Sequence, residues 1–208
     1  MIKYKKIWFN PAWKEGADSA LYGNGGFYET ANEQGQVNNT LRSIDELGYE
    51  WIFNHGRILD YGCGNGAMVN NLNILYGDNR AYGYDPLTNY SMPSGTFSTV
   101  FCVHVIEHVK DPIDLIHDIR AELRPNGILC LVCHNVVGWP NKRAREHWHR
   151  WLFGKEIVQI IEAEGFKLKA RLTWGGSTAK IRWIKEAINW TRKKLGIGDV
   201  QMVIMEKT

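Results

Sequence analysis

The segment that most constrains the fold is "RILDY" at 57–61, a short apolar run that leads directly into glycines at alternate positions, Gly62, Gly64 and Gly66. After these glycines the chain predicts a helix over 67–77, because apolar residues return there at helical spacing, at Met68, Leu72 and Leu75. Glycines between a strand and a helix let the backbone turn tightly and let a ligand approach it. The segment therefore predicts a strand, a ligand-binding turn and a helix.

The rest of the chain continues this alternation of strands and helices. Apolar or alternating runs predict further strands at 81–85, 99–105, 128–134, 166–174 and 200–207. A helix is predicted at 111–123, where Asp111 suits the N-cap and Pro112 the first turn. A second is predicted at 154–165, with Ile157, Ile160 and Ile161 turned inward. Strands that alternate with helices argue for an α/β fold, with a mostly parallel sheet covered on both faces.

Length and composition are those of an ordinary globular protein, with 208 residues of which 44% are hydrophobic and 23% charged. The basic N-terminus has no apolar signal region, and no run approaches the length of a membrane-spanning helix. We therefore expect one cytoplasmic domain whose cysteines are reduced and buried. Cys130 and Cys133 have the C-x-x-C spacing, but residues three apart on a strand point to opposite faces, which argues against a metal or redox pair.

Asp60, directly before the glycines, indicates the chemistry of the ligand. A dinucleotide-binding turn has the spacing G-x-G-x-x-G, whereas this chain has G-x-G-x-G. A carboxylate at this place would repel a pyrophosphate, but it would attract a ligand that carries an ammonium and a sulfonium, such as S-adenosylmethionine. Asp85 ends the second strand, 19 residues after Gly66, where an acid can bind both ribose hydroxyls of a nucleoside.

From about Arg57 to Trp174 the sequence resembles the class I S-adenosylmethionine-dependent methyltransferases. "ILDYGCGNG" is similar to their glycine-rich first motif and "YGYDP" to their acidic second motif. The segments "TFSTVFCVHVIEHVKDP", "LRPNGILCLVCHN" and "FGKEIVQIIEAEGF" resemble the fourth strand, the fifth strand and the next helix of the subgroup that includes the ubiquinone-biosynthesis O-methyltransferases. The resemblance implies a Rossmann-like doubly wound sheet with an antiparallel last strand. We expect the cofactor to be bound by Asp60, Gly62, Cys63, Gly64, Gly66, Asp85, Pro86, Val103 and His104.

The segment after Asp85 departs from the family pattern. The family usually carries a helix and a third strand there, whereas this chain has only "PLTNYSMPSGTF" at 86–97. We therefore expect that helix and strand to be missing or reduced. The family also often places an acid near the adenine at the end of that strand, and no residue here clearly replaces it. The segment "YGNGGFYE" at 22–29 could supply the adenine wall, or could be plain loop.

The candidates for catalysis are His104, Glu107, His108 and His149. The first three have the spacing i, i+3, i+4, which places them on one face of a helical turn. The pattern resembles the Glu-x-x-Glu-His run and later His that hold a divalent ion in the small-RNA 2′-O-methyltransferases, with His104 in place of the first Glu. Three imidazoles and one carboxylate would suit zinc or another transition ion. The alternatives are a His general base, either His104 or His149, and a purely structural role. A structural role is also expected for the other histidines considered, His55, His117 and His134.

Two basic, tryptophan-rich segments could meet a substrate. Residues 139–151 follow the fifth strand and carry the basic residues Lys142, Arg143, Arg145 and Arg150. Residues 177–196 predict a basic amphipathic helix with an apolar stripe at Ile181, Ile184, Ile188 and Leu195. Such a helix can lie on a membrane surface, meet nucleic acid, or pack its stripe on the domain and leave a solvated basic face.

Together these features predict one methyltransferase domain over 1–208, with an N-terminal extension at 1–50, a cofactor-binding core at 57–174 and a basic helical insertion at 175–199. We expect methyl transfer to a hydroxyl or amine of a small metabolite or sugar, and the basic segments suit an anionic acceptor. One alternative is an RNA or nucleotide methyltransferase with a His/Glu metal site, although the net charge of +3 is mild. The other is a non-catalytic protein that binds the cofactor or a partner.

Overall fold

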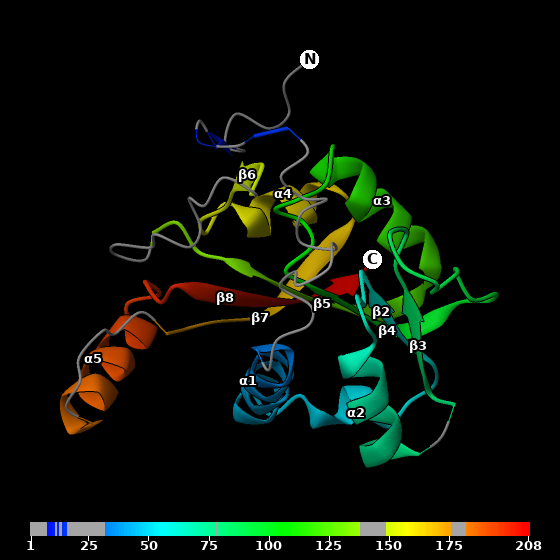
Figure 1. The fold of residues 1–208 in the computed structure, drawn as a ribbon, viewed down its shortest axis with the longest axis horizontal. Helices are drawn as coiled ribbons and strands as arrows, with labels where there is room; N and C mark the ends of the chain where they lie inside the picture. The colour runs from blue at the N-terminus through cyan, green and yellow to red at the C-terminus, as the bar shows by residue number, and fades with distance from the viewer. Residues whose placement is uncertain are drawn as a thin grey trace.

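The computed structural model describes residues 8–10, 12, 14–15, 32–77, 79–137, 149–175 and 182–208. Within these residues the centre of the molecule is a mixed sheet with helices on both faces (Figure 1). Its strands are β2 (Ile58–Tyr61), β3 (Ala81–Tyr84), β4 (Phe97–Val103), β5 (Leu123–His134), β7 (Phe166–Trp174) and β8 (Val200–Lys207). The helices are α1 (Asn32–Glu46), α2 (Ala67–Tyr76), α3 (Pro112–Glu122), α4 (Ile157–Ala163) and α5 (Arg182–Lys194), with a short 3-10 helix at Glu50–Phe53.

The strand order confirms the predicted fold class. The described strands lie in the order β3-β2-β4-β5-β8-β7, and the first four are parallel to one another. Strand β8 runs antiparallel to both β5 and β7, as the family resemblance implied. Residues 85–96 contain neither helix nor strand, so β3 is an edge strand and the element expected to be missing is indeed absent from this described stretch.

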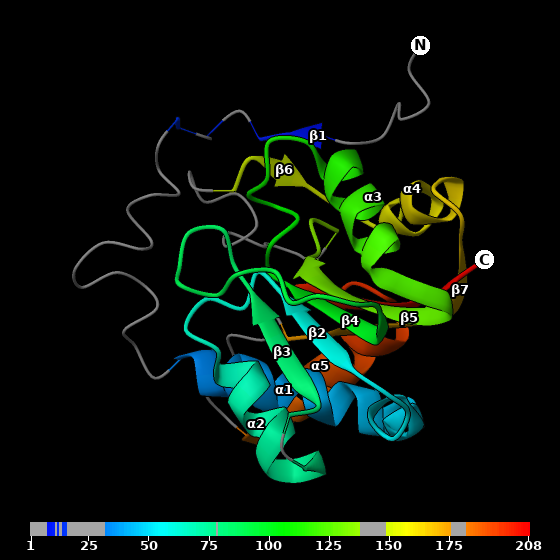
Figure 2. The ribbon, with the colours of Figure 1, turned by 90° about the vertical axis from the view of Figure 1, so that its right-hand side faces the viewer.

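The sheet separates two apolar layers, which both views show (Figures 1 and 2). Helices α3 and α4 cover one face, where Ile116, Ile119 and Ile161 pack on the inner side chains of β4 and β5. Helices α1 and α2 cover the other face through Ile44 and Leu72. A second small sheet, formed by β1 (Trp8–Phe9) and β6 (Trp151–Leu152), lies on the same side of the central sheet as α3 and α4 (Figure 2).

Local signals explain most element boundaries. The Asp111 carboxylate accepts hydrogen bonds from the backbone N–H groups of Ile113 and Asp114, and so caps α3 as predicted. The strand expected at 99–105 ends at Val103, because His104 leaves the sheet with a positive φ of 55°. The expectation that Leu75 belongs to the buried face of α2 was wrong, since Leu75 is 58% exposed. Val69, in the first turn of α2, is buried beside Met68 and Leu72.

The cysteines lie where the strand pattern placed them. All of them are free and buried. Cys130 packs in the layer under α1 and α2, and Cys133 packs in the layer under α3 and α4. The two thiols therefore face opposite sides of β5, and burial raises the pKa of each. Among the described residues, no helix combines the length and apolar character needed to cross a membrane.

Candidate active site

The turn after β2 requires its glycines. Gly62, Gly64 and Gly66 all have positive φ, at 81°, 55° and 84°. A Cβ atom on Gly62 would lie 2.3 Å from Cγ2 of Val105, so only glycine fits both the conformation and the space. The backbone N–H groups of Gly62 and Cys63 donate to the carbonyl oxygen of Tyr84, which fixes the turn against the end of β3. This turn lies at the carboxyl ends of the parallel strands, where α/β sheets bind ligands.

Two buried carboxylates converge on this turn. Asp60 is 4% exposed and Asp85 is 2% exposed. The Asp85 Oδ2 atom accepts a hydrogen bond from the backbone N–H of Gly64 at 3.0 Å, and its Oδ1 atom accepts one from Leu87 at 2.8 Å. Burial, and then the charges of Asp60 and Asp85, raise the pKa of the Cys63 thiol. The turn is thus electrically negative, which fits a cationic nucleoside better than a pyrophosphate.

Tyr90, which sequence reasoning missed, lies over the glycine turn. Its hydroxyl oxygen would be 2.2 Å from a Cβ on Gly66, and it donates to the carbonyl oxygen of Asn65 at 3.3 Å. The Asp85 backbone N–H donates to the Tyr90 carbonyl oxygen, which closes residues 85–90 into a compact loop. Pro86 lies in this loop and is exposed. The signal in the sequence was an aromatic residue within the shortened segment after Asp85.

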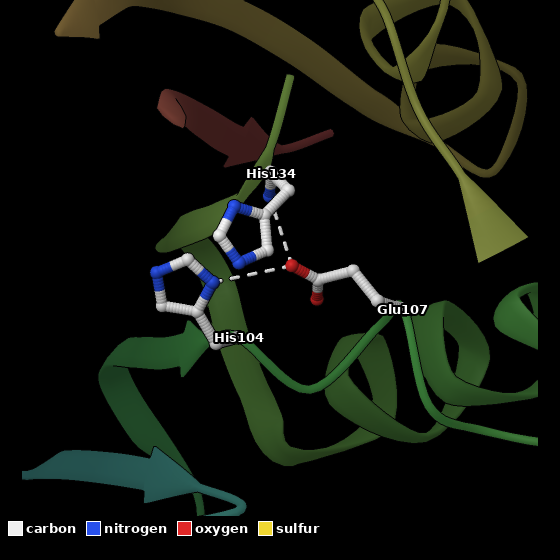
Figure 3. Close-up of side chains that lie close together, drawn as sticks. All are labelled: His104, Glu107 and His134. Atoms are coloured by element: carbon white, nitrogen blue, oxygen red, sulfur yellow. Dashed lines mark hydrogen bonds and ion pairs between the residues drawn. The ribbon is translucent and has the colours of Figure 1, made fainter. Parts of the chain in front are cut away.

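His104 and Glu107 form a pair immediately after β4. His104 adopts a left-handed conformation, which is uncommon for a residue with a side chain and is often found at functional sites. Its Nδ1 atom lies 3.2 Å from Oε1 of Glu107, and the same oxygen accepts a hydrogen bond from the backbone N–H of His134 at 2.9 Å (Figure 3). Val105 joins this pair to the glycine turn, because its side chain covers Gly62.

His134, for which only a structural role was expected, lies among the other histidines of the site. Its ring lies 4.7 Å from that of His104 and 4.8 Å from that of His149, and the rings of His108 and His149 are 4.9 Å apart. The structure therefore brings together the predicted candidates His104, Glu107, His108 and His149, and places His134 in the middle of them. Pairing of Val103 with Val132 in the parallel strands β4 and β5 explains this, since both strands end at the same edge.

The N-terminal strand helps to hold His149 in this cluster. The Asn10 side chain donates to the carbonyl oxygen of His149 at 2.8 Å, and the Asn10 backbone N–H donates to that of Arg150. The backbone N–H groups of Arg150 and Trp151 both donate to the carbonyl oxygen of Glu107. The segment that carries His149 is therefore tied to the turn that carries Glu107.

The electrostatics of the cluster favour an ionised Glu107 and a neutral His134. Burial alone would raise the pKa of Glu107, but its hydrogen bond to His104 and the charges of His104, His134 and His108 hold that pKa below its ordinary value. Burial, and then the neighbouring His104, lower the pKa of His134 well below its ordinary value. An acceptor carboxylate therefore lies among imidazoles at neutral pH.

These residues also fit a metal ion. One donor atom each from His104, Glu107 and His134 lie within 4.8 Å of one another. Within the described part of the chain, Oε2 of Glu107 and Nδ1 of His134 are buried and make no hydrogen bond. Two imidazoles and a carboxylate are ligands that suit a divalent transition ion. The donor set differs from the expected one, because His134 joins His104 and Glu107 where His108 and His149 were expected.

Several predicted contacts lie outside the described residues. They are the adenine wall at 22–29 and most of the basic segment 139–151, including Lys142, Arg143 and Arg145. Of that segment the structure describes His149, Arg150 and Trp151. The Trp151 indole donates to the carbonyl oxygen of Val109 at 2.8 Å, so this side chain is engaged within the fold. His117 lies apart from the cluster and contacts Glu164.

The chain is similar to known methyltransferases in sequence and in fold. A family model described as a methyltransferase domain matches residues 33–170. A ubiquinone biosynthesis O-methyltransferase from Rickettsia canadensis is 23% identical over 149 residues, which cover 54% of this chain and 63% of that protein. The chain thus spans less than two thirds of the length of this curated relative.

Solved structures share the fold. A SAM-dependent methyltransferase from Archaeoglobus fulgidus superposes with a TM-score of 0.58 at 17% identity, over 86% of this chain and 96% of that chain. The N-methyltransferase NodS from Bradyrhizobium japonicum, solved in complex with S-adenosylhomocysteine, superposes with a TM-score of 0.55 at 13% identity, over 91% of this chain and 95% of that chain. Magnesium protoporphyrin IX methyltransferase from Synechocystis, solved with bound SAM, superposes with a TM-score of 0.53 at 16% identity, over 90% of this chain and 88% of that chain.

Proposed function

We propose that this chain, which belongs to the methyltransferase domain family, transfers a methyl group from S-adenosylmethionine to a hydroxyl or amine of a small metabolite or sugar. The observation that carries the proposal is the His104–Glu107 pair, which lies at the carboxyl edge of the sheet beside the glycine turn. An anionic acceptor remains an expectation from the basic residues of 139–151.

The glycine turn and its two acids would hold the cofactor. S-adenosylmethionine, when bound, supplies a methyl group on a sulfonium, which is already a good leaving group. Asp85 is placed to accept hydrogen bonds from ribose hydroxyls, since each of its oxygens has a second lone pair beyond its bond to the backbone. Asp60 supplies negative charge for the ammonium and the sulfonium.

His104 is the best placed residue to take a proton from the acceptor. Its side chain is 16% exposed, whereas that of Glu107 is 2% exposed, so the imidazole is the more open of the two to an acceptor. Because Glu107 is ionised, it accepts the Nδ1 proton of His104, and Nε2 is left with a lone pair. Glu107 thereby positions the base, and alignment of the acceptor does the rest of the work.

The test is a turnover assay that detects S-adenosylhomocysteine on a panel of sugars, phenols and amines, each with and without a phosphate or carboxylate group. With an active acceptor, His104→Asn should lower kcat at saturating cofactor by about 10²–10⁴, the usual contribution of a general base. The matched control is His117→Asn, which alters a histidine on α3 and should leave kcat unchanged. Wild-type kcat in His104→Asn would remove His104 as the base, and cofactor binding without turnover on any acceptor would favour the non-catalytic alternative.

A second candidate function is methyl transfer to RNA or a nucleotide with the help of a divalent ion. The donor atoms of His104, Glu107 and His134, with the buried Oε2 of Glu107, favour it. These side chains would hold the ion, which would supply positive charge near the acceptor oxygen. Turnover on an RNA or nucleotide acceptor that chelator abolishes and one added metal restores would support this function. Full activity after metal removal would exclude it.

A further inference from the structure

Helix α5 exposes several of its apolar side chains to solvent. Trp183 is 70% exposed, Trp190 is 63% exposed and Leu195, one residue beyond the helix, is 66% exposed. Ile188 is 39% exposed. At 100° per residue, these side chains lie within one half of the helix surface, which also carries Ile184, Ala187, Thr191 and Lys194. Of the stripe that the sequence predicts, Ile188 and Leu195 are exposed and Ile184 is half-buried, while Ile181 lies outside the described residues.

Basic side chains of α5 attach the helix to the domain. The Arg192 guanidinium contacts the Asp199 carboxylate at 2.6 Å and donates to the carbonyl oxygen of Ile197. Lys193 forms an ion pair with Glu46 at the end of α1. One sequence interpretation, in which the stripe packs on the domain and the basic face is solvated, does not hold for Ile188 and Leu195, which are exposed, nor for Arg192 and Lys193, which contact the domain. An amphipathic helix in a globular protein normally buries its apolar face, so this exposure needs an explanation.

The position of α5 is fixed relative to the active-site edge. The helix follows β7 and lies at one end of the sheet, away from α3 and α4 (Figure 1). Directly after His134, the Asn135 side chain donates to the carbonyl oxygens of Gly196 and Gly198, which follow the helix. The Asn135 backbone N–H donates to the carbonyl oxygen of Asp199. The strand end that carries His134 and the end of α5 are therefore bonded together.

We propose that the exposed face of α5 docks the protein on an anionic lipid surface. Tryptophan rings are favoured at the boundary between water and lipid, because they combine a large apolar body with a polar N–H group. Lys185 and Lys194 supply exposed positive charge on the helix, whereas Arg192 and Lys193 are engaged with Asp199 and Glu46. Lys194 stands 5.7 Å from the ring of Trp190, so positive charge borders the apolar face.

The charge pattern selects this occupant over a second copy of the chain. Two α5 helices packed face to face would bring their lysines together, and like charges at an interface oppose association. An anionic bilayer supplies both the apolar layer for the tryptophans and the negative charge for the lysines.

Vesicle co-sedimentation tests the proposal on the full chain. Wild-type protein should sediment with vesicles of phosphatidylcholine mixed with phosphatidylglycerol, and much less with phosphatidylcholine alone. A double variant, Trp183→Ser with Trp190→Ser, should lose this binding while its unfolding midpoint stays unchanged, since both rings are exposed. The matched control is Trp51→Ser, which removes a tryptophan that is 45% exposed on a different element and should bind as wild type does.

Charge provides a second arm of the test. Lys185→Gln and Lys194→Gln should each weaken binding to the anionic vesicles about fivefold, which corresponds to about 1 kcal/mol per charge. Absence of vesicle binding by the wild type, or equal binding by the double tryptophan variant, would overturn the proposal. Sedimentation velocity that shows a wild-type dimer, dissociated by the tryptophan substitutions, would overturn it in favour of a second copy.

Discussion

Replacement of Asp85 by alanine should weaken cofactor binding at least tenfold. If the carboxylate binds the ribose hydroxyls, its removal deletes charge-assisted hydrogen bonds that are worth about 1.5–3 kcal/mol. The substitution should also lower the stability of the fold, because the Asp85 carboxylate accepts hydrogen bonds from the backbone N–H groups of Gly64 and Leu87. Asp85 is only 2% exposed, so water cannot readily replace it. Each donor left unsatisfied costs about 1–3 kcal/mol of the free energy of unfolding.

Two measurements separate these effects. Urea unfolding without ligand reports the structural cost, and calorimetric titration with S-adenosylhomocysteine reports the loss of affinity. Asp111→Ala is the matched control, since Asp111 accepts similar backbone bonds at the start of α3. It should lose about 1 kcal/mol of stability as an N-cap and bind the ligand normally. If Asp85→Ala fails to fold, Asp85→Asn keeps one carbonyl oxygen and still removes the charge. A folded Asp85 variant that binds as tightly as wild type would refute the assignment.

Three further substitutions test other parts of the site. Gly62→Ala should destabilise the fold by about 2 kcal/mol or more in urea unfolding, because the new Cβ would lie 2.3 Å from Val105. The control is Gly48→Ala, which should cost less, because Gly48 has a similar φ but open space around it. The free energy of unfolding should fall as the pH drops below about 6.5, because the lowered pKa of His134 means that the unfolded chain binds a proton that the folded chain does not. His134→Gln should flatten this part of the plot of stability against pH. An identical plot for the variant would contradict the reasoning. The lowered pKa of Glu107 adds a further loss below about pH 4.3, which Glu107→Gln should reduce. If the cluster binds metal, elemental analysis should find about one divalent ion per chain, which His134→Ala releases and His117→Ala retains. No metal after soaking in zinc or manganese would remove the metal site and leave the His104 base.

The fold could be predicted from the sequence where local signals were strong. The runs at 166–174 and 200–207 match β7 and β8 at both ends, because their residue pattern is uninterrupted. Helix α3 was predicted well because Asp111 and Pro112 mark its start. The prediction that Leu75 is buried was wrong, because periodicity identifies a helix more reliably than it identifies which flank of the apolar stripe is buried. The methyltransferase resemblance is confirmed by the family match over residues 33–170.

The active-site cluster could be predicted only in part. Helical spacing grouped His104, Glu107 and His108, but it could not include His134, which is distant in sequence and reaches the cluster through the pairing of β4 with β5. Two histidines at the carboxyl ends of neighbouring parallel strands were the signal that could have found it. The orientation of α5 was equally out of reach, because ion pairs with Glu46 and Asp199 decide which face of the helix meets the domain.

A crystal structure with S-adenosylhomocysteine bound is the most direct test of the central claim. We expect the nucleoside between the Gly62–Gly66 turn and the Asp85 carboxylate, with its ribose hydroxyls bonded to Asp85. The sulfur should face His104, so that a methyl group on it would point toward the histidine cluster. A ligand bound elsewhere, or no bound ligand at saturating concentration, would contradict the assignment of this edge of the sheet as a methyltransferase active site.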